Sequence, residues 1–338
     1  MRSLTPEPPL EEKYGDLFRK YSNGDTVEHG EGTFNTEGVE EMELPLIDLG
    51  RLSLGGKEEE ECKREIALAS QEWGFFQVVN HGISREVLER MKSEQVKLFR
   101  RPFMEKVNDA CMNFPMGSYR WGSPSATRLS QLSWSEAFHV PMSNISGLTG
   151  RDNLSLTMEQ FATKISELAQ KLGQILAEKL GQDPMFFKEH CLPSTCYLRL
   201  NRYPPCAVSS KIVGLMPHTD SDFLTILHQD NIGGLQLVKD GKWIAVKPNE
   251  DALIINIGDL LQAWSNDVYK SVEHRVLTNQ HKERFSMAYF FCPSYDSIIQ
   301  SCGEPQVYRR FSFREFRQQV QDDVKRLGYK IGLPRFIL

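Results

Sequence analysis

The sequence lacks any Cys-x-x-Cys pair, and cysteine is scarce for a chain of 338 residues. Seven cysteines occur, an odd number, at positions 62, 111, 191, 196, 206, 292 and 302. This pattern argues against a disulfide framework and against a cysteine-type zinc site. The cysteine usage therefore predicts a reducing, cytosolic compartment.

Several other signals are missing as well. No apolar run approaches the roughly 18 residues of a transmembrane helix, and the N-terminal MRSLTPEPPLEEK lacks the apolar segment of a secretory signal. Acidic residues outnumber basic ones, 45 to 40, which argues against a general nucleic-acid binder. Neither a G-x-x-x-x-G-K-[ST] loop nor a strand-linked G-x-G-x-x-G motif occurs, so nucleotide binding is not indicated. We therefore expect a cytoplasmic or nuclear protein with no nucleic-acid or membrane partner.

Composition and periodicity divide the chain into three regions. Residues 1–40 are polar and scattered with glycine and proline, which predicts a loose leader or a short, peripherally packed helix. Residues 41–190 predict a largely helical region, with short strands at 44–49 and 73–83 and helices at 58–72, after Ser84 and near 157–181. Residues 191–338 form the third region, which is rich in strands.

The apolar period changes from helical to two after about residue 193, which is typical of strands. The strand-like segments are CYLRLNRY, FLTILHQ, GLQLV, KWIAVKP, ALIINIG, SVEHRVL and RFSMAYFF. Asp240-Gly241 predicts a tight hairpin, and a final helix begins at a Ser312–Glu315 capping box and ends at Gly328. We predict a mixed α/β protein with an all-β core, a sandwich or jelly roll, supported by N-terminal helices and a C-terminal helix.

His218-Thr219-Asp220 is the sharpest chemical signal. On a strand, residues i and i+2 point to the same face, so both side chains can approach one ion. Taken alone, the pair is better explained as a buried histidine beside a surface aspartate. His274, 54 positions after Asp220, adds a third donor, and two histidines with one carboxylate leave three metal positions open, as in non-haem Fe(II) oxygenases. The three residues are therefore the candidate metal ligands and catalytic centre.

A candidate anion site follows ten residues after His274. Arg284 and Ser286 are expected to share a strand face, where a guanidinium can grip a carboxylate bidentately and a hydroxyl can add a hydrogen bond. An arginine that points into a β-rich core needs an anion. The alternative is an arginine at a strand end that reaches solvent. Tyr203, in NRYPPC, offers a further hydroxyl to the same carboxylate.

In this order and spacing, H-x-D, a distal histidine, R-x-S and N-x-Y-P-x-C resemble the 2-oxoglutarate- and Fe(II)-dependent dioxygenases of plants, over nearly the whole chain. The resemblance implies a double-stranded β-helix core, iron on the three candidate ligands, and 2-oxoglutarate and dioxygen as cosubstrates. It implies that Arg284, Ser286 and Tyr203 hold the C5 carboxylate of 2-oxoglutarate, with Asn201 near its metal-bound end. Ascorbate is an expected supporting reductant.

Within that family, the chain looks most like the gibberellin 2-oxidases. The segments 217–237 and 256–276 carry this likeness, and residues 117–141 resemble the subgroup that acts on twenty-carbon gibberellins. Gibberellin 20-oxidases typically carry Leu-Pro-Trp-Lys-Glu where this chain has Leu-Ser-Trp-Ser-Glu at 132–136. The resemblance thus implies 2β-hydroxylation of a twenty-carbon gibberellin, a reaction that inactivates the hormone or its precursors.

Two alternatives stay open at this point. The first keeps the chemistry but changes the substrate to a nineteen-carbon gibberellin or another plant metabolite, such as a flavonoid or an alkaloid. The second is a non-catalytic β-barrel that binds a small hormone or a partner protein, which iron content and succinate formation would distinguish. Tyr119 and Arg120 are candidates for contact with the gibberellin, although Arg120 equally fits a surface salt bridge. The sequence does not indicate an oligomeric state.

Overall fold

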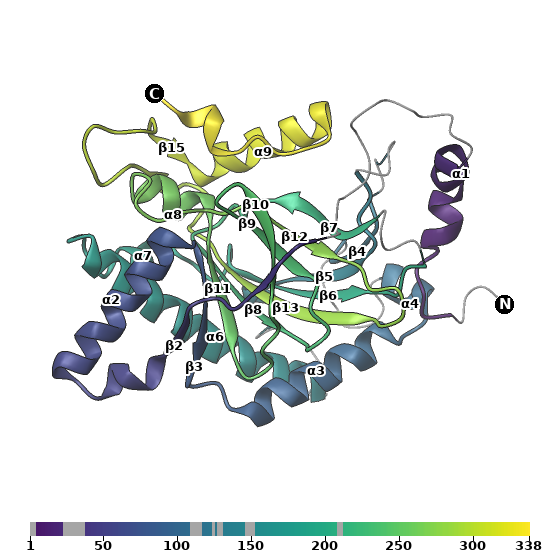
Figure 1. The fold of residues 1–338 in the computed structure, drawn as a ribbon, viewed down its shortest axis with the longest axis horizontal. Coiled ribbons are helices and arrows are strands. Elements are labelled where there is room, and N and C mark those ends of the chain that lie inside the picture. The colour runs from purple at the N-terminus through teal and green to yellow at the C-terminus, as the bar shows by residue number, and fades with distance from the viewer. Residues whose placement is uncertain are drawn as a thin grey trace.

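The computed structural model describes residues 5–22, 38–108, 117–123, 126, 131–145, 153–207 and 212–338. Its centre consists of two β-sheets that face each other, with helices around them (Figure 1). In the described residues, the larger sheet has the strand order β2-β3-β11-β8-β13-β6-β5-β4, and the smaller has the order β1-β10-β9-β12-β7. Only the pairs β2–β3 and β1–β10 are parallel within these two sheets. The predicted mixed α/β protein with a β core is confirmed.

Every segment predicted as a strand beyond residue 193 contains one. The strands of the larger sheet are β2 (Leu46–Asp48), β3 (Phe75–Val79), β4 (Tyr119–Trp121), β5 (Glu136–Pro141), β6 (Tyr197–Tyr203), β8 (Leu224–Gln229), β11 (Leu253–Ile257) and β13 (Arg284–Phe291). Those of the smaller sheet are β1 (Glu41–Met42), β7 (Val213–His218), β9 (Leu235–Lys239), β10 (Lys242–Val246) and β12 (His274–Leu277). A separate pair, β14 (Ile298–Ile299) and β15 (Phe311–Ser312), leads into the C-terminal helix. The strand β7, which ends at the candidate ligand His218, was not predicted from the sequence.

Helices cover the outer side of the larger sheet and its ends (Figure 1). The long ones are α2 (Gly56–Glu72), α3 (Arg85–Phe99), α6 (Asn153–Lys179) and α9 (Phe313–Leu327). The short ones are α4 (Phe103–Val107), α5 (Met142–Ile145), α7 (Phe186–His190) and α8 (Asp259–Trp264), with 3₁₀ turns at Leu49–Ser53 and Leu333–Phe336. Ser84 and Ser312 cap α3 and α9 as predicted, and Gly328 ends α9 in the left-handed conformation, with a φ of 86°.

The alternation of side chains along the larger sheet separates two cores. Leu200 and Met287 point outward and belong to the large apolar cluster that includes the helices. Tyr203 and Ile254 point inward and pack with Leu237 of the smaller sheet. Side chains of both sheets therefore line the space between them, and the polar residues that are candidates for catalysis and binding lie there.

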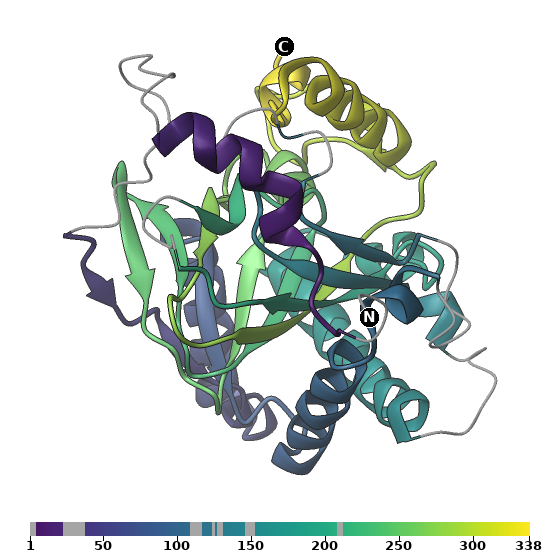
Figure 2. The same cartoon turned by 90° about the vertical axis from the view of Figure 1, so that its right-hand side faces the viewer.

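Residues 5–22 contain the short, peripherally packed helix that was one of the two predictions for this region. The helix α1 (Leu10–Ser22) buries Leu10 and Tyr14 against Leu132 and Trp134. Figure 2 shows α1 lying across the outside of the sheets. The apolar residues of α1 recur at helical spacing, which is the local signal for this helix. Residues 1–4 and 23–37 of the predicted leader lie outside the described residues.

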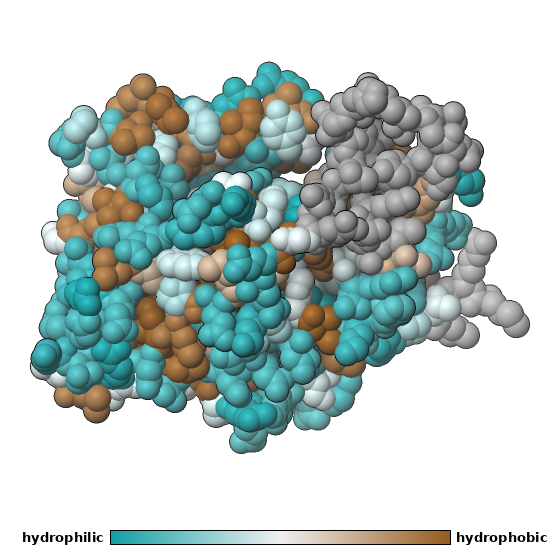
Figure 3. Space-filling view, in the orientation of Figure 1, coloured by the Kyte–Doolittle hydropathy of each residue, from teal (hydrophilic) through white to brown (hydrophobic). Residues whose placement is uncertain are grey.

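The cysteines that the structure describes form no disulfide bond. The cysteines that the structure describes, at 62, 191, 196, 206, 292 and 302, are free thiols, and all but Cys302 are buried. Within the described ranges, no helix combines the length and the apolar character needed to cross a membrane. The face drawn in Figure 3 is mainly hydrophilic, with separate hydrophobic patches.

Candidate active site

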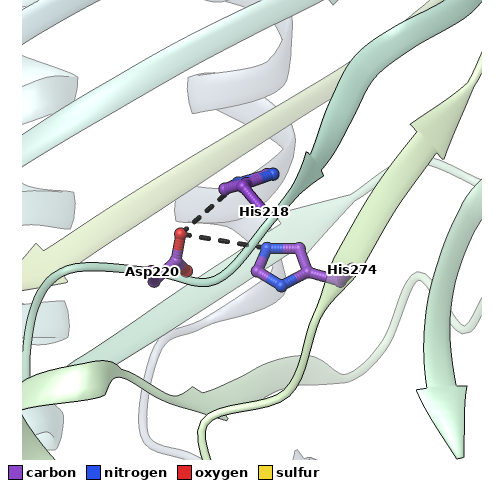
Figure 4. A group of neighbouring side chains, drawn as sticks. All are labelled: His218, Asp220 and His274. Carbon is purple, nitrogen blue, oxygen red and sulfur yellow. Dashed lines mark ion pairs between the residues drawn. The ribbon is translucent and has the colours of Figure 1, made fainter. Parts of the chain in front are cut away.

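The three predicted metal ligands lie together at one edge of the smaller sheet. His218 ends β7, His274 begins β12, and the two are opposite each other in this antiparallel pair. Asp220 Oδ1 lies 3.5 Å from Nε2 of His218 and 3.8 Å from Nε2 of His274 (Figure 4). One ligand atom from each residue lies within 4.8 Å of the other two. Their side chains therefore converge on a volume suited to a single ion.

His218 and Asp220 were expected to share a strand face, but only His218 lies in a strand. The strand β7 ends at His218, and Asp220 lies two residues beyond it, just before the bend at residues 221–223. The backbone N–H of Asp259 donates to the carbonyl oxygen of Asp220 over 2.9 Å and holds this segment beside α8.

Hydrogen bonds orient each donor atom. Nδ1 of His218 lies 2.7 Å from the carbonyl oxygen of Met216, and Nδ1 of His274 lies 3.0 Å from that of Val272. A proton on each Nδ1 is therefore donated to the backbone, which leaves the lone pair of each Nε2 free for a metal.

The carboxylate of Asp220 is held in the same way. Its Oδ2 accepts hydrogen bonds from the hydroxyl of Thr225 at 2.6 Å and from the amide of Asn256 at 2.7 Å. Oδ1, the atom nearest both imidazoles, is left for an ion. Thr225 and Asn256 are opposite each other on β8 and β11. Sequence reasoning missed both, since only strand pairing brings them to Asp220.

Burial and neighbouring groups set the charges of these ligands. Burial and the neighbouring His218 together lower the pKa of His274 to about 4. Burial by itself would raise the pKa of Asp220, but the two histidines and the Thr225 hydroxyl outweigh it and hold that pKa well below its usual range. At neutral pH, His274 is therefore neutral and Asp220 is ionised, the protonation states that metal binding requires.

The predicted anion site lies on the larger sheet, across the interior from the smaller one. Arg284 and Ser286 of β13 are opposite Tyr203 and Asn201 of β6, so all four side chains share the inner face. The Arg284 guanidinium lies 5.0 Å from the centre of the Tyr203 ring and donates to the Ser286 hydroxyl over 3.2 Å. A Cβ at Gly214 on β7 would lie 2.5 Å from Cδ1 of Tyr203, so glycine is required for this ring position. The strand-face prediction for Arg284 and Ser286 is thus confirmed.

The charge of Arg284 has no counter-ion among the described residues. Its side chain is only 2 % exposed, and no described carboxylate forms an ion pair with it. Gln229 of β8 accepts a hydrogen bond from Nη2 over 2.7 Å, while Nε of Arg284 and Nε2 of Gln229 have no partner in the described chain. A buried guanidinium without an anion is costly. The site is therefore built for an anionic ligand, and Gln229 is a member that the sequence did not reveal.

Comparison with known proteins agrees with this geometry. Residues 194–293 match the model of the 2OG-Fe(II) oxygenase superfamily, and residues 44–155 match that of the non-haem dioxygenase in morphine synthesis N-terminal region. Gibberellin 2-beta-dioxygenase 8 of Arabidopsis thaliana is 59% identical over 98% of both chains. The chain belongs to the 2-oxoglutarate- and Fe(II)-dependent oxygenase superfamily.

Other members of this superfamily are similar along most of their length. Gibberellin 2-beta-dioxygenase 6 of Oryza sativa is 48% identical and covers 98% of this chain and 96% of its own. The crystal structure of JOX2 in complex with 2OG, Fe and JA has a TM-score of 0.72 at 29% identity, over 93% of this chain and 94% of that one. The rice dioxygenase for auxin oxidation has a TM-score of 0.73 at 27% identity, over 88% of this chain and 100% of that one.

The residues present fit Fe(II) and 2-oxoglutarate, the two groups for which the superfamily is named. Two imidazole nitrogens and a carboxylate oxygen on one side of an ion suit Fe(II) and leave coordination positions open. The partnerless Nε of Arg284 and Nε2 of Gln229 fit a carboxylate of 2-oxoglutarate. His274 contacts Phe75 of the larger sheet edge-on, with ring centres 5.2 Å apart, so the metal ligands and the anion site open into the same interior.

Tyr119 and Arg120, the predicted substrate contacts of this oxygenase, point to opposite sides of β4. The Tyr119 hydroxyl donates to the carboxylate of Glu136 on the outer side of the sheet, where its ring packs against Phe138. The structure therefore places Tyr119 outside the site. Arg120 is opposite Ala137, which is opposite Asn201, so Arg120 shares the inner face.

Further inner-face residues form a wall that sequence reasoning missed. His139, Tyr197 and Phe290 stack in succession, with ring centres 3.9 Å and 4.5 Å apart. Arg199 is opposite His139 and donates to Asn201 over 2.9 Å. Burial and the positive charges of Arg199 and Arg120 lower the pKa of His139 to about 4. The available signal was the alternation in YLRLNRY, where every second residue from Tyr197 faces inward.

Proposed function

We propose that this chain is a gibberellin 2-oxidase that 2β-hydroxylates a twenty-carbon gibberellin with Fe(II), 2-oxoglutarate and dioxygen. The observation that carries the proposal is the convergence of His218 Nε2, Asp220 Oδ1 and His274 Nε2 on the interior that also holds the unpaired Arg284. The substrate class is supported by four gibberellin 2-beta-dioxygenases that are 42–59% identical along nearly the whole chain.

The chemistry divides between the bound groups and the protein. When bound, Fe(II) would activate dioxygen as the oxidant: one oxygen atom would convert a C–H bond to an alcohol, and the other would enter succinate as 2-oxoglutarate is oxidised with loss of carbon dioxide. His218, Asp220 and His274 hold the metal from one side and keep its other positions free. Arg284, with Ser286 and Tyr203, orients 2-oxoglutarate, and Asn201 lies toward its metal-bound end. The protein thereby decides which C–H bond is presented.

Replacing Arg284 should weaken 2-oxoglutarate binding more than it slows turnover. We expect Arg284→Ala to raise the apparent KM for 2-oxoglutarate about 30- to 4,000-fold, because a buried carboxylate loses its cation. This corresponds to about 2–5 kcal/mol of binding free energy. Succinate formation against 2-oxoglutarate concentration measures this. The control is Arg314→Ala, which removes an exposed arginine paired with Asp296. An unchanged KM in Arg284→Ala would remove Arg284 from the proposed site.

Two arginines on the inner face favour a dicarboxylic substrate. Arg199 and the exposed Arg120 share that face, and no described carboxylate forms an ion pair with either. Twenty-carbon gibberellins carry a second carboxyl group that nineteen-carbon gibberellins have closed into a lactone. A pocket with an aromatic wall and two cations therefore suits the twenty-carbon ring system. This charge match is the support for the proposed subgroup.

The deciding experiment offers both classes of gibberellin to the enzyme with Fe(II), ascorbate and 2-oxoglutarate. We expect mass spectrometry to show one added oxygen on twenty-carbon substrates, only when 2-oxoglutarate is present. Arg120→Ala should lower kcat/KM for these substrates about tenfold by removing one charge contact, with the KM for 2-oxoglutarate unchanged. Oxygen added only to nineteen-carbon gibberellins would overturn the subgroup, and oxygen added to neither would overturn the substrate class.

A further inference from the structure

The loop that carries Asp220 is bound by a lysine from the far end of the chain. Nζ of Lys330 donates to the carbonyl oxygen of Thr219 over 2.9 Å and to the hydroxyl of Ser221 over 2.8 Å. These two residues flank Asp220 in the sequence. Nζ also forms an ion pair with Asp259 over 2.7 Å, and the two side chains are only 11% and 4% exposed. Lys330 thus uses every one of its N–H donors near the loop.

Its partner Asp259, at the start of α8, contacts both segments that carry ligands. Oδ2 of Asp259 accepts from the Thr219 hydroxyl at 3.2 Å, and its backbone N–H donates to the carbonyl of Asp220 at 2.9 Å. Oδ1 accepts from the hydroxyl of Ser271 at 2.7 Å. Ser271 immediately precedes Val272, whose carbonyl orients His274. One buried ion pair therefore connects the segment of Asp220 with the approach to His274.

The segment that supplies Lys330 is firmly packed. After Gly328 ends α9, the chain turns back, and Leu333 and Phe336 enter the core at 6% and 1% exposure. The Phe336 ring lies 4.4 Å from that of Phe311, and Lys330 Nζ lies 5.6 Å from the centre of the Phe316 ring. In Figure 1, α9 and the C-terminus lie beside α8 at one end of the sheets. The position of Lys330 is fixed by this packing rather than by the loop that it holds.

We propose that Lys330, through its ion pair with Asp259, is a positioning residue for the metal ligands and raises the affinity of the protein for Fe(II). The proposal rests on the proposed iron site but not on the choice of gibberellin as substrate. Lys330 does not touch the ligand atoms. It acts by holding Thr219 and Ser221, so that the Asp220 carboxylate does not have to be ordered when the metal binds.

The direction of the effect separates positioning from charge. A lysine cation repels Fe²⁺, so the field of Lys330 alone makes metal binding weaker, and removing it would make binding tighter. Removing a positioning contact makes binding weaker. Loss of stability alone would lower the unfolding midpoint but leave the Fe(II) affinity of the folded protein unchanged. The three explanations therefore predict three different results for one variant.

The test measures the dissociation constant of Fe(II) alone, under argon, by competition with a chromogenic chelator. We expect Lys330→Met to bind Fe(II) about tenfold more weakly than wild type, Lys330→Arg to retain most of the affinity, and Ser221→Ala to lose about two- to threefold. The matched control is Lys325→Met, which removes an exposed lysine of α9. Circular dichroism and the unfolding midpoint show which variants are folded at the temperature used.

Equal or tighter Fe(II) binding by Lys330→Met than by Lys325→Met would overturn the positioning role while leaving the iron site intact. Wild-type protein that binds no Fe(II) would instead overturn the proposed iron site itself. Should Lys330→Met not fold, Ser221→Ala decides, because it removes one loop contact and leaves the ion pair in place. Unchanged affinity in that variant would also overturn the proposal.

Discussion

Asp220→Ala and His218→Ala should each abolish turnover while the protein stays folded. Each substitution removes one of three donor atoms that lie within 4.8 Å of one another. Without it, the remaining pair holds Fe(II) weakly and no longer fixes the open positions. We expect succinate formation to fall by more than about a thousandfold, which corresponds to about 4 kcal/mol of lost catalysis. Mass spectrometry of succinate and metal content measured after desalting check this expectation.

The two variants differ in what they leave behind. Asp220→Ala leaves Thr225 and Asn256 without their shared acceptor, so we expect a loss of about 1–3 kcal/mol in unfolding free energy beside the loss of activity. His218 is more exposed, and its removal should be better tolerated by the fold. The matched control is His281→Ala, an exposed histidine on another loop. Activity near the wild-type level in either ligand variant, with the control normal, would contradict the proposed metal site.

Glu136→Gln should destabilise the protein by about 3–5 kcal/mol. Glu136 lies at the centre of a buried ionic cluster formed by Glu7, Lys106, Glu136, Arg202 and Glu283. Its two oxygens accept from Lys106 at 2.5 Å and from Arg202 at 2.6 Å, and both cations are almost fully buried. Neutralising the central carboxylate leaves the fully buried Lys106 without its anion, next to Arg202, which keeps Glu7 and Glu283 as partners. The loss is the difference in unfolding free energy between the variant and wild type, measured by urea denaturation with the m-value unchanged.

An exposed ion pair on α6 supplies the control for this cluster. Glu167→Gln removes one partner of an exposed pair with Lys164 and should cost less than about 1 kcal/mol. Combining Glu136→Gln with Lys106→Met should cost less than the sum of the two single changes, because the second removes a charge that the first had left unpaired. A cost below about 1 kcal/mol for Glu136→Gln alone would contradict a tightly packed cluster.

This cluster also explains why Tyr119 and Arg120 behave so differently. Their side chains are adjacent in the sequence, and both are able to bind a carboxylate. The register of β4 with β5 sends Tyr119 to the ionic cluster on the outer face and Arg120, an exposed residue, to the opposite face. Sequence reasoning identified residues of suitable chemistry but had no means of choosing the face, since alternation fixes only that the two neighbours differ.

The strand β7 was missed for a related reason. Its sequence, VGLMPH, contains glycine and proline, which are disfavoured in strands. The structure shows why Gly214 is present: a side chain there would collide with the ring of Tyr203. A residue that weakens the local strand signal is thus required by a contact with another sheet. Local propensity therefore failed at the strand that carries a candidate ligand.

The sequence by itself determined most of the segments that form strands and helices, the Ser84 and Ser312 caps, the hairpin at Asp240, and the chemical types and order of the candidate ligands. These follow from periodicity and side-chain chemistry, which act over a few residues. Only the tertiary structure decided that His218 faces His274, that Gln229, Thr225 and Asn256 support the site, and that Lys330 reaches the loop of Asp220. Those contacts depend on strand register and on packing between distant segments, and no local pattern in the chain specifies either.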